Sequence, residues 1–273
     1  MTAPIQRRLP AIYEYFCLYA GLTALGVMCL GWSLFAALLH PFMGAEGGRR
    51  LGRRAITGIF HVYVRLLGAL GACRFDISAL DELRDQGPMI LAPNHPCLLD
   101  AVMVIARLPN VACIMKASLM SNPFLGGGSR LARYIPNARP LQMVYAACDE
   151  LSRGSQLLMF PEGTRTLRYP VNEITPSVAL IARRAKVPVQ VIIIETDSDY
   201  LSKGWPLFRR PAMPIHYRIR LGRRLDPPRD AGVFCAELED CFAEELARAE
   251  FVPPQFAAAA TQATQATQAA PAT

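Results

Sequence analysis

Lysine is scarce in this sequence: three lysines stand beside 26 arginines, and the formal net charge is nevertheless +7. Because the planar guanidinium fork matches phosphate and carboxylate groups, the arginine excess predicts an anionic lipid, a phosphorylated substrate or an acidic carrier protein as partner. The sequence also lacks zinc-finger spacing, an RNA-binding aromatic motif and a basic recognition helix. We therefore expect no nucleic acid partner.

Paired cysteines are missing too. The eight cysteines are scattered through apolar stretches, without a Cys-x-x-Cys pair and without a histidine at metal-ligand spacing. This pattern favours buried thiols in a reducing compartment over disulfides or a metal site. A Gly-x-Ser-x-Gly turn and clusters of metal-binding carboxylates are also absent from the sequence, which disfavours a hydrolase or a phosphatase. We expect neither a metal nor a redox cofactor.

One long stretch has no charge at all, because residues 15–39 contain no acidic or basic side chain. About 20 apolar residues suffice to cross a bilayer, so the stretch predicts a retained membrane helix. A secretory signal peptide is the competing interpretation, since Arg7 and Arg8 precede the stretch, but no small-x-small cleavage site follows it. The stretch also contains three glycines. A further alternative is therefore a helical hairpin that enters the membrane and turns back to the same side.

Four arginines lie within residues 49–54, just beyond the apolar stretch. They outnumber the two arginines that precede it, so the positive-inside rule places the rest of the chain in the cytoplasm. Together these features predict a bacterial inner-membrane protein with a cytoplasmic main domain. Residues 56–70 have helical spacing, with His61 and Arg65 on one side, which fits either a core helix or a helix lying in the membrane interface.

From residue 73 onward, short apolar runs alternate with segments of helical spacing. This predicts an α/β fold with a largely parallel sheet flanked by helices, preceded by the N-terminal membrane helix or hairpin. The expected strands are 74–77, 89–92, 111–115, 157–160, 189–194 and 215–221, and the expected helices are 97–107, 141–153, 177–186 and 231–250. The predicted segments are a membrane anchor with its basic flank (1–54), an interfacial or packing helix (55–72), a main domain (73–252) and a disordered Ala/Thr/Gln tail (253–273).

The strand expected at 89–92 ends at a loop that contains His95, and a helical segment with Asp100 in its first turns follows. Loops after strands are where α/β sheets present reactive groups. An aspartate five residues beyond a histidine can bind one ring nitrogen, fix the tautomer and leave the other nitrogen free to accept a proton. Cys97 is a competing candidate as a nucleophile, but its position early in the helix favours burial. We predict His95 and Asp100 as the catalytic residues.

A second tight turn, Phe160-Pro161-Glu162-Gly163-Thr164-Arg165, follows the strand expected at 157–160. Proline and glycine around a lone glutamate force the turn, and the arginine suits a bidentate contact with phosphate. Because a parallel sheet brings the carboxyl ends of its strands to one edge, we expect this turn beside the histidine loop.

The motif Asn-His-x4-Asp, followed downstream by Phe-Pro-Glu-Gly-Thr-Arg, resembles the glycerolipid acyltransferase family, typified by 1-acyl-glycerol-3-phosphate acyltransferase, over roughly residues 88–194. The resemblance implies that His95 is the general base and that Asp100 orients it. It also implies a late motif flanking the acyl site at residues 187–189, a lysophospholipid acceptor, and acyl-CoA or acyl-acyl carrier protein as donor. The substrate-binding residues that it implies are Asn94, Glu162, Gly163, Thr164 and Arg165, with the arginine on the phosphate.

The sequence departs from the family pattern in two places. A further phosphate-binding arginine is expected before the second turn, and both Arg133 and Arg139 are candidates for it. A positive charge expected after the turn is missing from residues 174–177. The default expectation is acyl transfer to 1-acyl-sn-glycerol-3-phosphate, giving phosphatidate. The alternatives are an acyltransferase of a specialised lipid pathway, with a non-standard acceptor or a carrier-protein donor, and a non-catalytic membrane lipid-binding protein.

Two other segments have competing interpretations. The glycines at 126–128 predict a flexible turn, with room for a ligand as the alternative. Residues 205–210 combine Trp205 and Phe208 with Arg209 and Arg210, a basic and aromatic cluster that fits either a bilayer surface or a solvated loop with a packed tryptophan.

Overall fold

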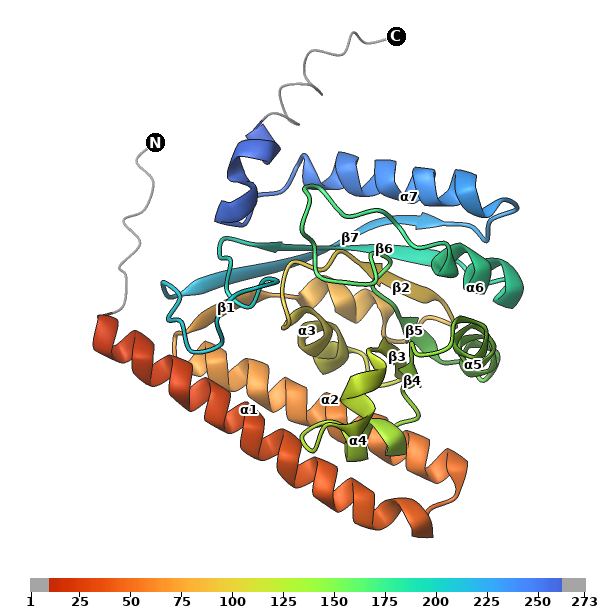
Figure 1. Ribbon diagram of the computed structural model, residues 1–273, viewed down its shortest axis with the longest axis horizontal. Coiled ribbons are helices and arrows are strands. Elements are labelled where there is room, and N and C mark those ends of the chain that lie inside the picture. Colours follow the sequence, from red (N-terminus) through yellow and green to blue (C-terminus); the bar gives the residue numbers. More distant parts are fainter. Residues whose placement is uncertain (1–9, 262–273) are drawn as a thin grey trace, which may run out of the picture.

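The computed structural model describes residues 10–261. Its centre is a seven-stranded sheet in the order β1-β7-β6-β2-β5-β3-β4 (Figure 1). The five strands from β6 to β4 are parallel, β7 runs antiparallel to β6, and β1 lies parallel to β7 at the edge. The strands are β1 (Cys73–Asp76), β2 (Ile90–Pro93), β3 (Val111–Met115), β4 (Ile135–Pro136), β5 (Gln156–Leu158), β6 (Val189–Thr196) and β7 (Ile215–Leu225). The expected α/β fold with a largely parallel sheet is confirmed.

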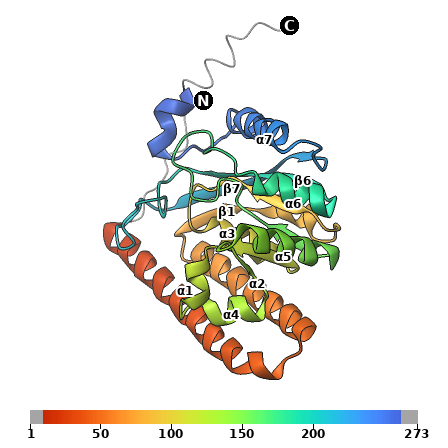
Figure 2. The ribbon, with the colours of Figure 1, turned by 45° about the vertical axis from the view of Figure 1, so that its right-hand side comes forward.

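Helices cover both faces of the sheet (Figures 1 and 2). One layer contains α1 (Ala11–Leu39), α2 (Ala45–Ala69), α3 (Asp100–Arg107) and α4 (Gly126–Leu131), and the other contains α5 (Pro140–Ser152), α6 (Ser177–Ala185) and α7 (Ala231–Leu246). Short 3-10 helices lie at η1 (His40–Phe42), η2 (Ser78–Leu83), η3 (Ala117–Ser121) and η4 (Pro254–Phe256). A separate hydrophobic cluster fills the space on each side of the sheet, so the sheet is buried on both faces.

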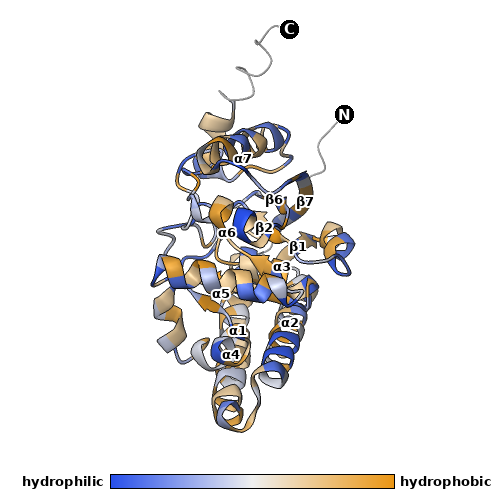
Figure 3. Cartoon of the chain, turned by 90° about the vertical axis from the view of Figure 1, so that its right-hand side faces the viewer, coloured by the Kyte–Doolittle hydropathy of each residue, from blue (hydrophilic) through white to orange (hydrophobic). Residues whose placement is uncertain are grey.

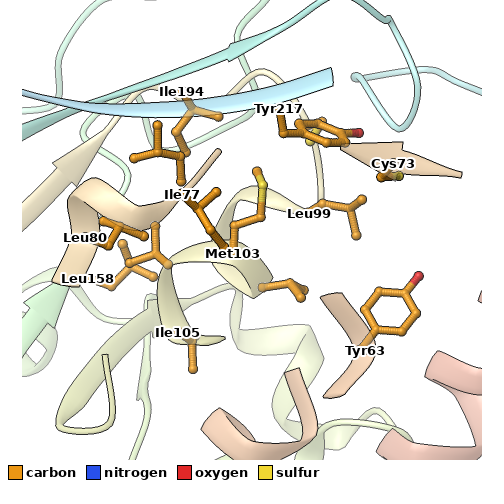
Figure 4. Packing of buried hydrophobic residues seen from close by; sticks show 14 of the residues in the cluster. Tyr63, Cys73, Ile77, Leu80, Leu99, Met103, Ile105, Leu158, Ile194 and Tyr217 are labelled. Atoms are coloured by element: carbon orange, nitrogen blue, oxygen red, sulfur yellow. The ribbon is translucent and has the colours of Figure 1, made fainter. Parts of the chain in front are cut away.

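The cluster beneath the sheet joins α3 to α2. Ile194 of β6 and Tyr217 of β7 face Met103 of α3, while Tyr63 of α2 closes the other side of the cluster (Figure 4). Every residue of β6 is buried, as expected for a strand in the middle of a sheet covered on both faces. This packing holds α3, and therefore its first residue Asp100, rigidly against the sheet.

Several element boundaries differ from those expected from the sequence. β3 has the expected bounds, but α3 begins at Asp100 instead of residue 97. The two-residue β4 was missed, because so short a strand has no detectable periodicity. The expected domain boundary between residues 54 and 55 falls inside the continuous helix α2.

The N-terminal apolar stretch forms one uninterrupted helix, so the hairpin within residues 15–39 was wrong. Within the described residues, α1 with η1 is the one helix long and apolar enough to cross a membrane, and only 17% of its most apolar window is buried. Its exposed large side chains are Ile12, Tyr13, Tyr15, Phe16, Tyr19, Val27, Leu34, Phe35 and Leu38. The chain returns through α2, which packs beside α1. Figure 3 shows the contrast between the apolar α1 and the hydrophilic, arginine-rich part of α2.

The glycines at 126–128 form α4, and this helix packs directly against α1. A Cβ atom on Gly127 would collide with the backbone of Ser33, and one on Gly128 would lie 2.7 Å from the Trp32 ring. The Ser33 hydroxyl also accepts a hydrogen bond from the Gly127 amide (2.9 Å). The prediction of a flexible turn was therefore wrong, because these glycines allow two helices to approach closely.

Part of the arginine-rich flank is internal. Arg53 is buried and donates to Glu150 (2.6 Å), to the Ser155 hydroxyl (2.7 Å) and to the Ala132 carbonyl (3.1 Å). Arg49 also donates to Glu150 (3.1 Å). Two of the four arginines that suggested a cytoplasmic flank thus tie α2 to α5 and to the loop before β5.

The C-terminal segment was expected to be disordered from residue 253. The structure instead gives η4 there, with Phe256 buried, and the Gln255 amide donates to Asp199 (3.0 Å). The remainder of the predicted tail, residues 262–273, lies outside the described residues.

Candidate active site

The loop after β2 carries the predicted catalytic pair at the carboxyl edge of the sheet. His95 Nδ1 lies 2.7 Å from Oδ2 of Asp100. Asp100 is completely buried, whereas 15% of the His95 side chain is exposed. An ionised carboxylate at this distance requires the proton on Nδ1, so Nε2 is the nitrogen with a free lone pair. Nε2 bonds to no residue within 10–261, and the pair is therefore arranged to accept a proton from a bound hydroxyl.

Asp100 is held by Cys97 as well as by His95. Its Oδ2 accepts a hydrogen bond from the Cys97 amide (2.9 Å), and its Oδ1 accepts one from the Cys97 thiol (3.0 Å). Asp100 is also the first residue of α3, where the helix dipole favours a negative charge. These contacts stabilise the ionised carboxylate without exposing it to water.

Cys97 is a donor and not a nucleophile in this arrangement. The side chain is buried, and burial together with the neighbouring Asp100 raises the pKa of the thiol well above its ordinary value. A thiol that remains protonated does not attack a carbonyl carbon. The structure thus supports the interpretation that Cys97 belongs to the core.

The imidazole of His95 is also fixed by an aromatic neighbour. The Phe160 ring lies parallel to it, with ring centroids 3.8 Å apart and planes inclined by 20°. The imidazole is thus held on one face by the stacked ring and at one edge by the hydrogen bond to Asp100. These two contacts fix its orientation. Phe160 was predicted as the end of a strand and the start of the second turn, but not as a site residue, although its place directly before the Pro-Glu-Gly-Thr-Arg turn was the available signal.

Glu162 joins the second turn to the histidine loop. Its Oε1 accepts hydrogen bonds from the His95 amide (3.0 Å) and the Thr166 hydroxyl (2.7 Å), and its Oε2 accepts one from the Asn172 amide (2.8 Å). Burial raises the pKa of this carboxyl, and the three donors partly offset the effect. Glu162 was expected to bind the acceptor, but its hydrogen bonds instead hold the backbone of His95 in place.

Asn94 has a similar structural role. Its amide group donates to the Ile194 carbonyl (2.9 Å) and accepts from the Ile194 amide (2.7 Å), which extends the pairing of β2 with β6 by one residue. The side chain is buried. Asn94 was expected to bind substrate, but its contacts in the structure set the direction in which the chain leaves β2 toward His95.

The remaining residues of the second turn lie at the surface. Gly163 has φ +67°, which the tight turn requires and other residues rarely adopt, and both Gly163 and Thr164 are exposed. Arg165 donates through one nitrogen to the carbonyls of Leu201 (2.8 Å) and Ser202 (2.7 Å). That anchor holds the guanidinium at the carboxyl edge of the sheet, and its other nitrogens make no hydrogen bond within the described part of the chain.

The two arginines proposed as the further phosphate-binding residue, Arg133 and Arg139, lie at opposite edges of the sheet. Arg133 precedes β4, and its neighbour Ala132 binds Arg53 at the edge where β3 and β5 begin, opposite His95. Arg139 follows β4 and lies exposed at the carboxyl edge, where parallel strands end together. Arg133 therefore lies at the opposite edge of the sheet from His95, whereas Arg139 lies at the same edge as His95. β4 is three strands away from β2 in the sheet, which corresponds to a distance of about 14 Å between the two strands.

A known protein family is similar to the segment that carries this site. The family model described as acyltransferase matches residues 74–195, which include the histidine loop and the second turn. Residues 74–195, somewhat less than half of the chain, are therefore similar to the acyltransferase family.

The chain has curated relatives in several organisms. The putative 1-acyl-sn-glycerol-3-phosphate acyltransferase acl-2 of Caenorhabditis elegans is 27% identical over 47% of this chain and 48% of its own length. The chloroplastic BAT2 enzyme of Brassica napus is 25% identical over 69% and 54%, and the mouse alpha enzyme is 24% identical over 66% and 65%. Both carry the same enzyme name. The chain thus spans about half to two thirds of the length of these relatives.

A solved structure shares the fold of most of this chain. The crystal structure of the 1-acyl-sn-glycerophosphate acyltransferase PlsC from Thermotoga maritima matches with a TM-score of 0.58 and 18% sequence identity. The match covers 86% of this chain and 94% of the other.

Proposed function

We propose that the protein is an O-acyltransferase that moves a fatty acyl chain from a thioester to a hydroxyl of a lysophospholipid. The observation that carries the proposal is the hydrogen-bonded pair of His95 and Asp100, with the free Nε2 at the carboxyl edge of the sheet. In the reaction, Nε2 takes the hydroxyl proton while the acceptor oxygen attacks the thioester carbonyl carbon. The C–S bond then breaks, and the proton on the imidazolium passes to the departing thiolate.

The acceptor that we propose is 1-acyl-sn-glycerol-3-phosphate, which gives phosphatidate. The names of the relatives support this acceptor. Its phosphate would bind the free nitrogens of Arg165, with Arg139 as the second cation on the same edge. No metal or redox cofactor takes part in this mechanism, because the acyl thioester is already activated.

A second candidate differs only in the substrates. Thr175 fills the place where a further cation was expected, and its hydroxyl donates to the Pro161 carbonyl (2.9 Å). That arrangement favours a less charged acceptor or a carrier-protein donor, as in a specialised lipid pathway. Lysophosphatidate and neutral lyso-lipids, each offered with acyl-CoA and with acyl carrier protein, separate the two candidates by which pair gives the highest kcat/KM.

The membrane attachment that we propose is along the surface of the cytoplasmic leaflet of a bacterial inner membrane. Glu14 near one end of α1 accepts from the Met213 amide (2.9 Å), and Ser33 near the other end binds α4. These contacts are 19 residues apart, about 28 Å along a helix, which nearly equals the hydrocarbon thickness of about 30 Å. A spanning α1 would place Arg210, which pairs with Glu14, and α4 at opposite faces of the bilayer, and the domain to which both belong would have to pass through the hydrocarbon region. A helix lying in the interface, with its exposed apolar face in the lipid, avoids that cost.

The decisive experiment for acyl transfer is the His95→Ala variant. We expect its kcat to fall at least 10³-fold with the preferred substrate pair, since general base catalysis supplies about 10²–10⁴-fold and the residue is also the proton donor to the thiolate. Arg168→Ala is the matched control, because this exposed side chain follows the second turn and lies outside the catalytic pair. His95→Ala protein that acylates at the wild-type rate would contradict the mechanism, and wild-type protein without turnover on any pair would support a lipid-binding protein instead.

A further inference from the structure

A cavity of about 260 Å³ lies between α2, β1 and α3, away from the catalytic pair. Asp100 and Arg107 stand at opposite ends of α3, seven residues or about 10 Å apart along the helix axis, and the cavity is at the Arg107 end. It is lined by His61, Val64, Arg65, Gly68, Phe75, Ile77, Ala106 and Arg107. None of the residues of the proposed acyl-transfer site contributes to it.

Three basic side chains face this cavity with little acidic compensation. His61 and Arg65 come from successive turns of α2 and make no hydrogen bond or ion pair with any residue from 10 to 261. Arg107 pairs through one terminal nitrogen with Asp81, but its Nε is buried without a hydrogen-bond partner among the described residues. Asp81 therefore leaves part of the hydrogen-bonding capacity of the Arg107 guanidinium unused, and an unpaired buried donor is energetically unfavourable.

The other walls of the cavity are apolar. Val64 on α2, Phe75 and Ile77 at β1, and Ala106 on α3 surround the basic groups. The volume is slightly below the range of roughly 300–1,000 Å³ typical of sites for small molecules. It therefore fits a phosphate with a short apolar or glycerol portion, and not the acyl chains of a whole lipid.

We propose that this cavity is a second binding site, specific for a phosphate group, which takes the headgroup of an anionic phospholipid. Arg65 and Arg107 supply charged donors to the phosphate oxygens, and the apolar walls contact the glycerol portion. The site lies on α2, beside α1. Binding here requires no acyl donor, so it is measurable separately from acyl transfer.

The test is titration calorimetry of the full chain in neutral detergent, without donor, against short-chain dihexanoyl phosphatidate. Inorganic phosphate and dihexanoyl phosphatidylcholine are titrated in parallel to separate a lipid headgroup from a free anion. Arg65→Gln and Arg107→Gln are each expected to weaken phosphatidate binding about tenfold or more, since each removes a charge-assisted contact. Arg54→Gln is the matched control, because Arg54 is exposed on the same helix outside the cavity.

Retained affinity in Arg54→Gln and loss in both cavity variants supports the site. Tighter binding of phosphatidate than of inorganic phosphate assigns the lipid headgroup, whereas equal affinities assign the free anion and overturn the lipid assignment. Because Arg107→Gln also removes a partner of Asp81, the exposed Arg65 provides the variant that leaves the fold intact. Absence of binding, equal loss in Arg54→Gln, or loss in Arg139→Gln instead of the cavity variants overturns the proposal.

Discussion

Replacing Asp100 by asparagine isolates the contribution of its charge to the proposed catalysis. Oδ2 of Asp100 accepts both the His95 Nδ1–H and the Cys97 amide, so an amide oxygen at that position retains both hydrogen bonds. The amide nitrogen then faces the Cys97 sulfur, which is a weak acceptor. The geometry of the site is therefore preserved while the negative charge beside the imidazolium is lost.

The magnitude of the loss follows from the distance. Two unit charges about 4 Å apart interact by about 4 kcal/mol at an effective dielectric constant of about 20, which corresponds to about 10³-fold in rate. If the amide instead turns its NH2 group toward His95, the tautomer is inverted and the loss is about 10⁴-fold, as in other histidine-aspartate pairs. We expect kcat of Asp100→Asn to fall 10³- to 10⁴-fold, with little change in the KM of the acceptor.

The assay follows the thiol released from acyl-CoA with a thiol-reactive chromophore, and circular dichroism compares the folding of the variant with wild type. Asp149→Asn is the matched control, since Asp149 forms an exposed pair with Arg153 on α5 and lies outside the site. A loss smaller than tenfold in Asp100→Asn would refute the reasoning, because it would mean that no imidazolium forms beside this carboxylate in the rate-limiting step.

Three further predictions follow from contacts around the site and along α1. Phe160→Ala removes the ring stacked on the imidazole, so its kcat should fall about tenfold, whereas Phe160→Tyr should retain activity. An unchanged kcat in the alanine variant would show that Phe160 does not position the imidazole. Cys97→Ala should keep kcat within about tenfold, and iodoacetamide should leave the folded wild type active, because the raised pKa keeps this buried thiol protonated over the pH range of the assay. Gly127→Val should lower the melting temperature by about 3–10 °C, as overpacking costs about 1–3 kcal/mol, while Gly31→Ala, whose added methyl group meets no atom within 4 Å, should not lower it.

The geometry of the proposed catalytic pair was predictable because it is local. His95 lies in the loop after β2 and Asp100 five residues later begins α3, so a strand followed by a helix gives their relative position without knowledge of the rest of the fold. The order of the strands was not needed to recognise them. The second turn was predictable for the same reason, since proline and glycine fix its shape within a few residues.

The roles of Asn94 and Glu162 could not be derived in the same way. The partner of Asn94 is Ile194, 100 residues further along the chain, and Glu162 binds the backbone of His95, which precedes it by 67 residues. When the hydrogen-bond partners of a polar residue are unknown, its place beside a predicted catalytic histidine suggests that it contacts the substrate. Only the pairing of β2 with β6 and β5 shows that these two side chains hold the loop.

The arginine-rich flank is a related case. Arg53 was counted among the charges that determine membrane orientation, but Glu150, 97 residues later, makes it part of the interior. The cost of burying a guanidinium is offset only by a partner that local sequence does not reveal. The distinction between Arg133 and Arg139 likewise depended on the direction of β4, a strand too short to predict.

The contact between Glu14 and Met213 also has a consequence for the synthesis of the chain. The two residues are 199 positions apart, and a ribosome adding about 5–20 residues per second needs roughly 10–40 s to make the intervening chain. The apolar helix α1 lacks α4 during the first part of that time, and it lacks the segment that covers its first turn during all of it. Early contact with lipid would shield its apolar surface until those partners emerge, so a cell-free synthesis with vesicles present from the start should yield more folded protein than one in which vesicles are added at the end.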